Sequence, residues 1–175
     1  MLVKTQVVGI LKLISSGKKL MIPVTNGKRT IAQANNKKKI FTEIDRDFVN
    51  YGCDVESMGK PETETEVYEM VEDGDFRKIF GSFGVNLDLL CLTQDQILSW
   101  IEIHSDWLRT DGHATFFLFK ADIKNVYQFF VTRVNVRSGG LYVHVFPLSS
   151  DGLWYAVYRP RVVVPQLVHT VALSI

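Results

Sequence analysis

The spacing of hydrophobic residues changes near residue 113, from a helical period to a strand period. Thr93 and Gln96 have the spacing of a capping box that opens a helix. The positions that follow repeat every three or four residues, as on one helical face: Ile97, Trp100, Ile101, His104 and Leu108. Residues 114–119 are apolar on both faces, which is typical of an interior strand, whereas residues 130–137 alternate as in a half-buried strand.

Turn residues divide the C-terminal half into strands. Ser138 to Gly140 and Ser149 to Gly152 separate apolar stretches that we interpret as a four-stranded antiparallel meander ending at residues 153–157. Helices followed by a run of strands predict an α+β fold, with the helices packed on one face of the meander. The tail from Val162 is apolar, and Pro165 is expected either to stop a strand there or to confine it to a sheet edge.

The N-terminal half predicts short elements. Residues 3–14 have helical apolar spacing, which Gly9 weakens, and the Asn26-Gly27 pair predicts a short hairpin between residues 20–24 and 30–32. Further along, Thr63 and Glu66 have capping-box spacing ahead of a helix through residues 67–71. Asp75 is expected to cap another helix that starts at Phe76.

Composition and turn signals suggest three parts. Residues 1–53 form a basic N-terminal segment with the helix and hairpin, residues 54–65 form an acidic linker that contains Gly59 and Pro61, and residues 66–175 form the α+β domain. The alternative is a single domain that includes residues 1–53.

The near-neutral total of +1 hides two opposite blocks of charge. The first 41 residues contain no acidic residue and nine basic ones: Lys4, Lys12, Lys18, Lys19, Lys28, Arg29, Lys37, Lys38 and Lys39. Residues 42–76 contain twelve carboxylates against Arg46 and Lys60. The two blocks either pair with each other or attract separate partners.

The other compositional features indicate an ordinary folded protein. Hydrophobic residues make up 46% and charged residues 22%, as in globular domains. No apolar run is long enough to span a membrane, and the N-terminus lacks a secretory pattern, so we expect a cytoplasmic protein. The two cysteines form no Cys-x-x-Cys pair, and phosphate-loop, dinucleotide and zinc-protease motifs are missing from the sequence. The sequence therefore assigns no catalytic residue, metal or cofactor.

Nucleic-acid binding is suggested by lysines near residue 38 and by an aromatic strand face. Arginine and aromatic side chains alternate with aliphatic ones in the meander, and such faces stack nucleobases in several RNA-binding sheets. The candidate residues are Lys37, Lys38, Lys39, Arg133, Arg137, Tyr142 and Trp154. The alternative is that the helices cover this face and that the lysines pair with the acidic block.

An enzyme site is a further hypothesis. Two histidines and two aspartates, His104, Asp106, Asp111 and His113, lie close together between a helix end and a strand start. The simpler interpretation places His104 on the apolar helix face and the aspartates at caps and turns, and it leaves the reaction unspecified.

The stretch from Trp107 to Gly112, followed by Phe116 to Phe119 and later by Val162 to Leu167, resembles a family of uncharacterised bacterial proteins. The similarity covers the chain from about Met21 onward. It implies a bacterial origin and adds no catalytic residue.

We therefore expect, first, a non-enzymatic intracellular domain that binds another protein. The alternatives are a weak, non-specific nucleic-acid binder and a small enzyme with a site near His104 and His113.

Overall fold

Nine strands form one mixed, mostly antiparallel sheet in the computed structural model, which describes residues 6–167 of this α+β protein. The strand order is β1-β2-β5-β9-β6-β7-β8-β4, and β3 also pairs with β5. The strands are β1 (Val7–Val8), β2 (Leu11–Leu13), β3 (Leu20–Ile22), β4 (Glu43–Ile44), β5 (Thr63–Met70), β6 (Ala114–Ile123), β7 (Val126–Arg137), β8 (Gly140–Pro147) and β9 (Arg161–Pro165).

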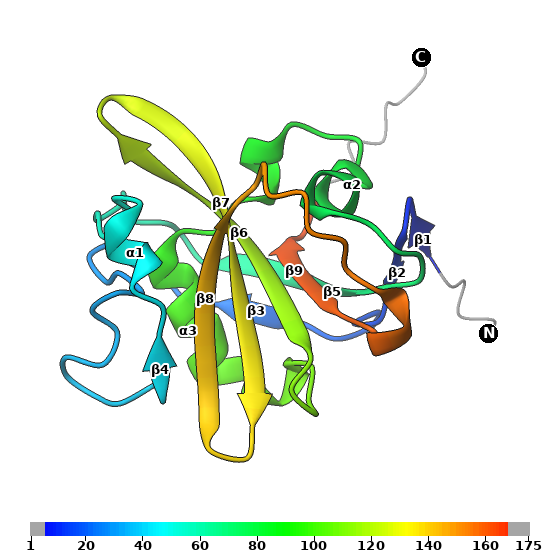
Figure 1. Ribbon diagram of the computed structural model, residues 1–175, viewed down its shortest axis with the longest axis horizontal. Coiled ribbons are helices and arrows are strands. Elements are labelled where there is room, and N and C mark those ends of the chain that lie inside the picture. Colours follow the sequence, from blue (N-terminus) through cyan, green and yellow to red (C-terminus); the bar gives the residue numbers. More distant parts are fainter. Residues whose placement is uncertain (1–5, 168–175) are drawn as a thin grey trace.

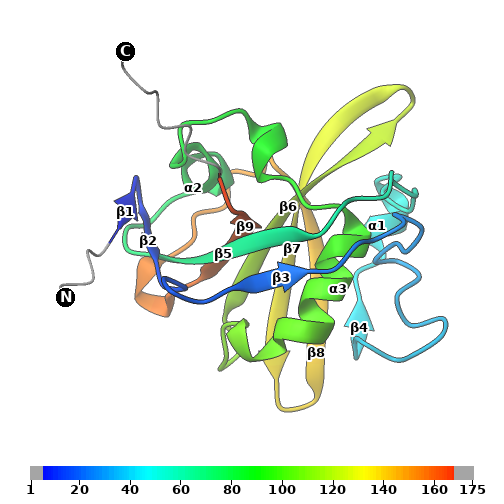
Figure 2. The ribbon, with the colours of Figure 1, turned by 180° about the vertical axis from the view of Figure 1, so that it is seen from behind.

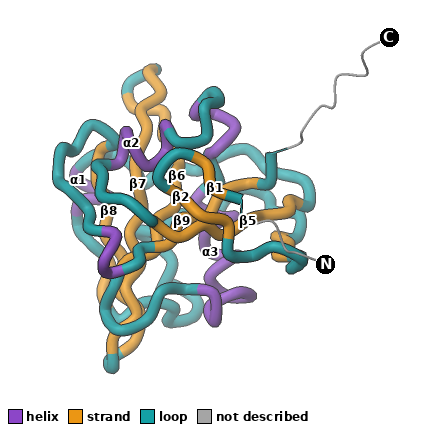
Figure 3. The backbone as a smooth tube through the Cα atoms, turned by 90° about the vertical axis from the view of Figure 1, so that its right-hand side faces the viewer, coloured by secondary structure: helices purple, strands orange, loops and turns teal. Residues whose placement is uncertain are grey.

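The helices are few and short. They are α1 (Asp47–Asn50), α2 (Phe76–Gly81) and α3 (Gln94–His104), with single 3₁₀ turns at Leu87–Leu90, Ser105–Trp107 and Ala156–Tyr158. Strands cross the middle of the molecule, and loops surround them (Figure 3).

Strands β6, β7 and β8 form the predicted meander, but it has three strands and not four. Their pairing is antiparallel and continuous, and the β6–β7 hairpin extends beyond the body at the upper left of Figure 1. Its turn residues Lys124 and Asn125 have φ of 53° and 64°, as a two-residue hairpin turn requires. The predicted fourth strand is wrong, because Trp154 pairs with Gly74 through a single bridge and residues 156–158 form a 3₁₀ turn.

Strand β9 lies inside the sheet, antiparallel to β5 and parallel to β6. Val162, Val163 and Val164 are fully buried. The strand stops at Pro165, as one of the two sequence alternatives predicted, and the other alternative, an edge strand, is wrong. The tail after Leu167 lies outside the described residues.

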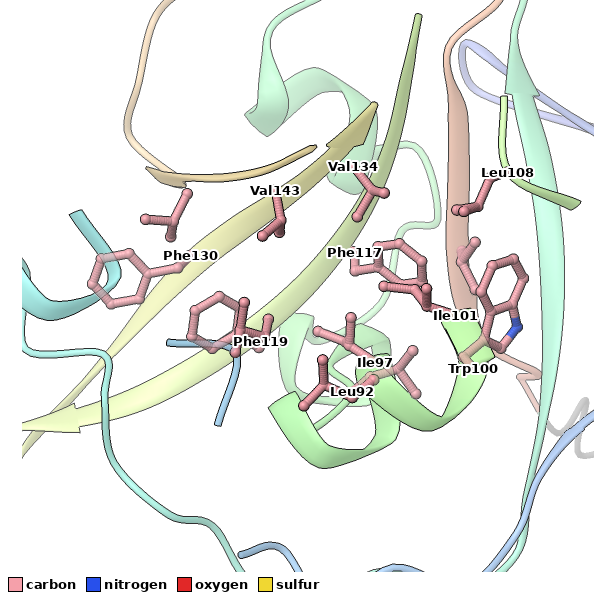
Figure 4. Packing of buried hydrophobic residues seen from close by; sticks show 14 of the residues in the cluster. Leu92, Ile97, Trp100, Ile101, Leu108, Phe117, Phe119, Phe130, Val134 and Val143 are labelled. Atoms are coloured by element: carbon pink, nitrogen blue, oxygen red, sulfur yellow. The ribbon is translucent and has the colours of Figure 1, made fainter. Parts of the chain in front are cut away.

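Helices cover both faces of the sheet, which corrects the prediction of one covered face. On the side that we call the α3 face, Ile97, Trp100 and Ile101 pack against Phe117 and Phe119 (Figure 4). On the opposite side, the α2 face, residues of α2 pack against the alternate positions of β6 and β9: Phe76, Ile79, Phe80, Phe116, Leu118, Val162 and Val164. Figure 2 shows α3 in front of the sheet, and Figure 1 shows the sheet from the other side. The two-sided burial explains why residues 114–119 are apolar on both faces, with Thr115 as the one polar residue among them.

The N-terminal helix prediction is wrong for the described residues of that segment. Residues 7–13 form the β1–β2 hairpin, with Val8 paired with Leu11. Gly9 at the turn has a φ of 53°, which a glycine adopts without strain. The Asn26-Gly27 hairpin is also wrong, because Thr25 pairs with Lys60 and residues 31–38 form turns.

The predicted helix after Thr63 is a strand. Thr65 and Val67 point to the α3 face, where Thr65 accepts a hydrogen bond from Trp100, whereas Tyr68 and Met70 belong to the α2 face. Val67 and Met70 therefore lie on opposite faces of β5 and not on one helical face.

The predicted capping of α2 and α3 is confirmed. Asp75 accepts a hydrogen bond from the backbone of Lys78, and Thr93 and Gln96 form a complete capping box. The proposed domain boundary between residues 65 and 66 falls inside β5. Strands β2 and β3, which belong to the basic N-terminal segment, pair with β5, which lies in the acidic block of residues 42–76.

The first turn of α3 anchors the long segment between β3 and β5. The buried Gln94 side chain accepts a hydrogen bond from the Ile31 N–H and donates one to the Cys53 carbonyl, at 3.0 and 2.7 Å. Next to it, the buried Asp95 carboxylate accepts hydrogen bonds from the Gly27 N–H and from Arg29. Two consecutive side chains therefore order a segment that contains little regular structure.

We expect Gln94→Ala to lower the free energy of unfolding by about 2–4 kcal/mol, because it leaves two buried backbone groups without partners. Urea denaturation followed by circular dichroism measures this loss. Gln128→Ala is the matched control, since Gln128 is exposed on β7 and should change stability little. Equal stability of the two variants would contradict the anchoring role of Gln94.

Candidate functional site

Four of the predicted site residues come together on the α2 face: Arg133, Arg137, Tyr142 and Trp154. In the β7–β8 pairing, Arg133 lies opposite His144 and Asn135 lies opposite Tyr142. Alternate residues of a strand share a face, so Arg133 and Arg137 lie on the same side as these partners. We call this surface the arginine face and define it by Arg133, Asn135, Arg137, Tyr142, His144, Phe146 and Trp154.

Both arginines of this face lie over aromatic rings. The Arg133 guanidinium carbon is 5.2 Å from the centroid of the Phe146 ring and 5.6 Å from that of Trp154. The Arg137 guanidinium is 4.9 Å from the Tyr142 ring. Such cation–π contacts contribute about 0.5–2 kcal/mol each, depending on burial.

The segment after β8 brings Trp154 to this position. Its backbone pairs with Gly74 in both directions, and its ring packs against Phe76 and Phe116, with centroid distances of 5.5 and 4.8 Å. The α2 face is therefore covered near α2, as the packing alternative predicted, but Arg137 is exposed and Arg133, Tyr142 and His144 are only partly buried. The face is thus covered by packing near α2 and accessible to a ligand near Arg137.

Burial makes the arginine face electrostatically costly. Desolvation, with a smaller contribution from Arg137, lowers the pKa of Arg133 from its ordinary value, and Asp45 opposes this shift in part. Among residues 6–167, neither Arg133 nor Arg137 forms an ion pair. The two Asp45 carboxylate oxygens already accept hydrogen bonds from the Asp47 and Val145 N–H groups. A partly buried guanidinium thus lacks a direct counter-ion in the described chain.

Unpaired polar atoms gather on the same face. Of the seven buried side-chain atoms without a hydrogen-bond partner within the described part of the chain, four belong to this face: Arg133 Nε, Asn135 Oδ1, His144 Nδ1 and Trp154 Nε1. Unpaired buried groups cost about 1–3 kcal/mol each, so their clustering is more typical of a binding surface than of a packed interior. A hollow of about 520 Å³ adjoins the face at Arg137, bordered by the 110–112 turn and Ser138.

The three predicted lysines lie elsewhere. Lys37, Lys38 and Lys39 are exposed in the loop before β4, and Asn35 closes that loop by accepting hydrogen bonds from Ile40 and Phe41 and donating one to Phe41. Lys37 and Lys38 border a pocket with Glu102 of α3. Since α3 covers the other side of the sheet, the structure divides the seven predicted residues between two separate surfaces.

A third surface is an exposed apolar segment on the way to β9. Leu153, Tyr155, Val157 and Tyr158 are each at least half exposed, and Val157 reaches 78%. Tyr158 stacks on His113 with a centroid distance of 4.8 Å, and Tyr155 meets Tyr158 edge to face. Exposed apolar patches of this kind are typical of protein contact sites.

The histidines of the enzyme hypothesis have separate contacts. His104 Nε2 lies 2.8 Å from the Met21 carbonyl and its ring packs on Trp100, whereas His113 packs on Tyr158. No group of three or more histidine, cysteine, aspartate or glutamate residues within 6–167 is arranged to hold a metal ion.

The cysteines are poor nucleophiles in this fold. Burial raises the pKa of Cys53 and of Cys91 to about 12, so both thiols stay protonated at neutral pH.

Comparison with protein-family models, curated proteins and solved structures finds no match to this chain. The resemblance to uncharacterised bacterial proteins therefore stays a prediction. None of the helices in the described residues has the length and apolar character needed to cross a membrane.

Sequence reasoning placed Arg133, Arg137 and Tyr142 on one side of the sheet, because strand alternation fixes which residues share a side, whereas Trp154 reaches this face from the segment after β8 and not from the predicted fourth strand. It missed the pocket that Lys37 and Lys38 share with Glu102, because these residues are more than sixty positions apart in the sequence. It also missed Asn35, whose role depends on the backbone path of the loop and has no signal in composition.

The charge of Arg133 on the arginine face should affect the pKa of His144. Desolvation, and then the Arg133 charge, lowers the pKa of His144 from its ordinary value, so the neutral ring is favoured in the folded state. We expect Arg133→Met to raise this pKa, because methionine keeps the packing and removes the charge. A proton NMR titration of the His144 ring measures it, with Arg77→Met as the control for an exposed arginine on α2.

The same shift predicts the direction of the pH dependence of stability. A folded-state pKa below the unfolded value means that the unfolded chain binds the proton more readily, so stability should fall as the pH drops through about 6.5. His144→Phe should weaken this dependence. A pKa of His144 that does not respond to Arg133→Met would contradict the electrostatic description of the face.

Proposed function

We propose that this protein is a non-enzymatic binding domain and that its arginine face binds single-stranded nucleic acid without strong sequence preference. The observation that carries the proposal is that Arg133 and Arg137 both lie over aromatic rings and have no ion-pair partner in residues 6–167.

An anionic ligand supplies the counter-ion that the arginine face lacks. A partly buried guanidinium without a counter-ion is unfavourable, and a phosphate group can accept two parallel hydrogen bonds from an arginine. Arg133 and Arg137 lie four residues apart on β7, with Asn135 between them on the same face, so at roughly 7 Å per two residues their backbone positions are roughly 14 Å apart. The two arginines can therefore contact two phosphates of one strand that are not adjacent.

The aromatic groups favour a single strand over a duplex. Bases of a single strand stack on aromatic rings and on arginine planes, and this stacking contributes about 1–3 kcal/mol per base. Tyr142 is half-buried at the open end of the face, next to the exposed Arg137. Sequence-specific reading of duplex DNA requires an element that enters a groove, and the arginine face is a sheet surface on which α2 occupies one end.

We expect the protein to bind a labelled single-stranded oligonucleotide in fluorescence anisotropy, with affinity that falls as salt rises. The double variant Arg133→Gln, Arg137→Gln should weaken binding about tenfold or more, and the slope of log affinity against log salt should decrease by about 0.7 for each lost phosphate contact. Urea unfolding of the same variant checks that it remains folded.

The matched control is Lys18→Gln, Lys19→Gln, which removes the same charge from the exposed turn between β2 and β3. Equal losses in the two double variants would mean that only net charge matters and would overturn the assignment of the arginine face. Absence of binding at low salt would reject the nucleic-acid function altogether.

A protein partner is the second candidate function, and the exposed apolar segment from Leu153 to Tyr158 favours it. Aromatic residues such as Tyr155 and Tyr158 are enriched at protein interfaces, where the ring is buried and the hydroxyl stays near water. If the oligonucleotide does not bind at low salt, this segment becomes the preferred functional surface.

A further inference from the structure

A second basic site lies on the other side of the sheet, between the loop of residues 28–40 and helix α3. The pocket has a volume of about 400 Å³, which is within the range of small-molecule sites. One wall is the loop that contains Lys28, Lys37 and Lys38, and Glu102 of α3 contributes to the opposite side. The pocket shares no residue with the arginine face.

The pocket contains more basic than acidic side chains. Arg29 is the one basic residue with ion-pair partners there, since its guanidinium binds Asp95, Glu102 and the Ser99 hydroxyl. Lys28, Lys37 and Lys38 form no ion pair within the described residues. Four basic groups thus face two carboxylates, Glu102 in the lining and Asp95 behind Arg29, which leaves an excess of two positive charges.

The backbone that carries these lysines is held in place. Thr30 and Gln33 both donate hydrogen bonds to Asp54, and the Ile31 N–H donates to the Gln94 side chain. Asn35 closes the turn that presents Lys37 and Lys38. A ligand therefore meets a loop that is already ordered, which lowers the entropic cost of binding.

One part of the pocket is apolar. Ala34 and Ile40 line it, and both also pack against the hydrophobic cluster of the α3 face. The site consequently combines an apolar surface fixed to the core with a cationic rim. Compact lysine ammonium groups suit phosphate as point charges, whereas planar carboxylates are usually bound by arginine forks.

We propose that this pocket binds a small metabolite that carries two linked phosphates, with its non-phosphate part against Ala34 and Ile40. The negative charge of a diphosphate complements this excess of two positive charges. The site is independent of the proposed nucleic-acid function, because it uses other residues on the opposite side of the sheet.

Isothermal titration calorimetry of the full-length protein with ADP, pyrophosphate and adenosine tests the proposal. ADP and pyrophosphate should bind, and adenosine, which lacks phosphate, should not. Tighter binding of ADP than of pyrophosphate identifies a nucleotide-like ligand that uses Ala34 and Ile40, whereas equal affinities identify the phosphate chain alone as the ligand. Either result supports a diphosphate site, and equal affinities would overturn the contact of the non-phosphate part with Ala34 and Ile40.

The double variant Lys37→Gln, Lys38→Gln should weaken pyrophosphate binding about tenfold or more, since each lost charge-assisted contact costs about 1 kcal/mol or more. Both lysines are exposed, so the fold should persist, and circular dichroism checks it. Lys18→Gln, Lys19→Gln is again the charge-matched control and should bind as the wild type does.

Lack of binding by both phosphate compounds at low millimolar concentration would overturn the proposal, as would an equal loss in the control variant. Testing each double variant with the ligand of the other site distinguishes the pocket from the nucleic-acid function. Loss of ADP binding in the Arg133→Gln, Arg137→Gln variant would reject the pocket. Loss of oligonucleotide binding in the Lys37→Gln, Lys38→Gln variant, but not in the arginine variant, would reject the arginine face and leave the pocket in place.

Discussion

The insertion of β9 between β5 and β6 is the constraint on which the rest of the structure depends. Val162 to Val164 lie in the middle of the sheet, so both of its faces must be covered, one by α3 and the other by α2. Because β8 lies beyond β6 and β7, the chain must cross the sheet to reach β9. It crosses the α2 face, and this crossing carries Trp154 to Arg133. The candidate binding face is thus a consequence of the strand order.

Two arginines show how differently this fold treats buried charge. Burial tends to lower the pKa of Arg29, but the hydrogen bonds that Arg29 donates to Asp95 and Glu102 outweigh it and raise the pKa, so this arginine has a structural role in anchoring the segment after β3. Arg133 experiences the same desolvation with aromatic rings in place of carboxylates, and its pKa is lowered. A charge that is desolvated but not neutralised by its own chain is better explained by binding than by stability.

Local signals predicted some elements well and others badly. The caps at Asp75 and Thr93 are satisfied by side chains and N–H groups within three residues, so the sequence contains the whole interaction. The segments at residues 7–13 and 67–70 were wrongly predicted as helical, because the apolar residues of these short strands fall at helical spacing by coincidence. The pairing of β5 with strands from both ends of the chain resolves that ambiguity only after folding.

The sequence by itself determined the α+β class, the β6–β8 meander and the side of the sheet on which Arg133, Arg137 and Tyr142 lie, because these follow from alternation along a strand and from turns of a few residues. Only the tertiary structure decided that β9 is interior, that helices cover both faces, and that Lys37 and Lys38 lie beside Glu102 and not beside Arg133. Those outcomes depend on contacts between residues that are far apart in the sequence, where the burial of apolar surface, and not local preference, selects the partner.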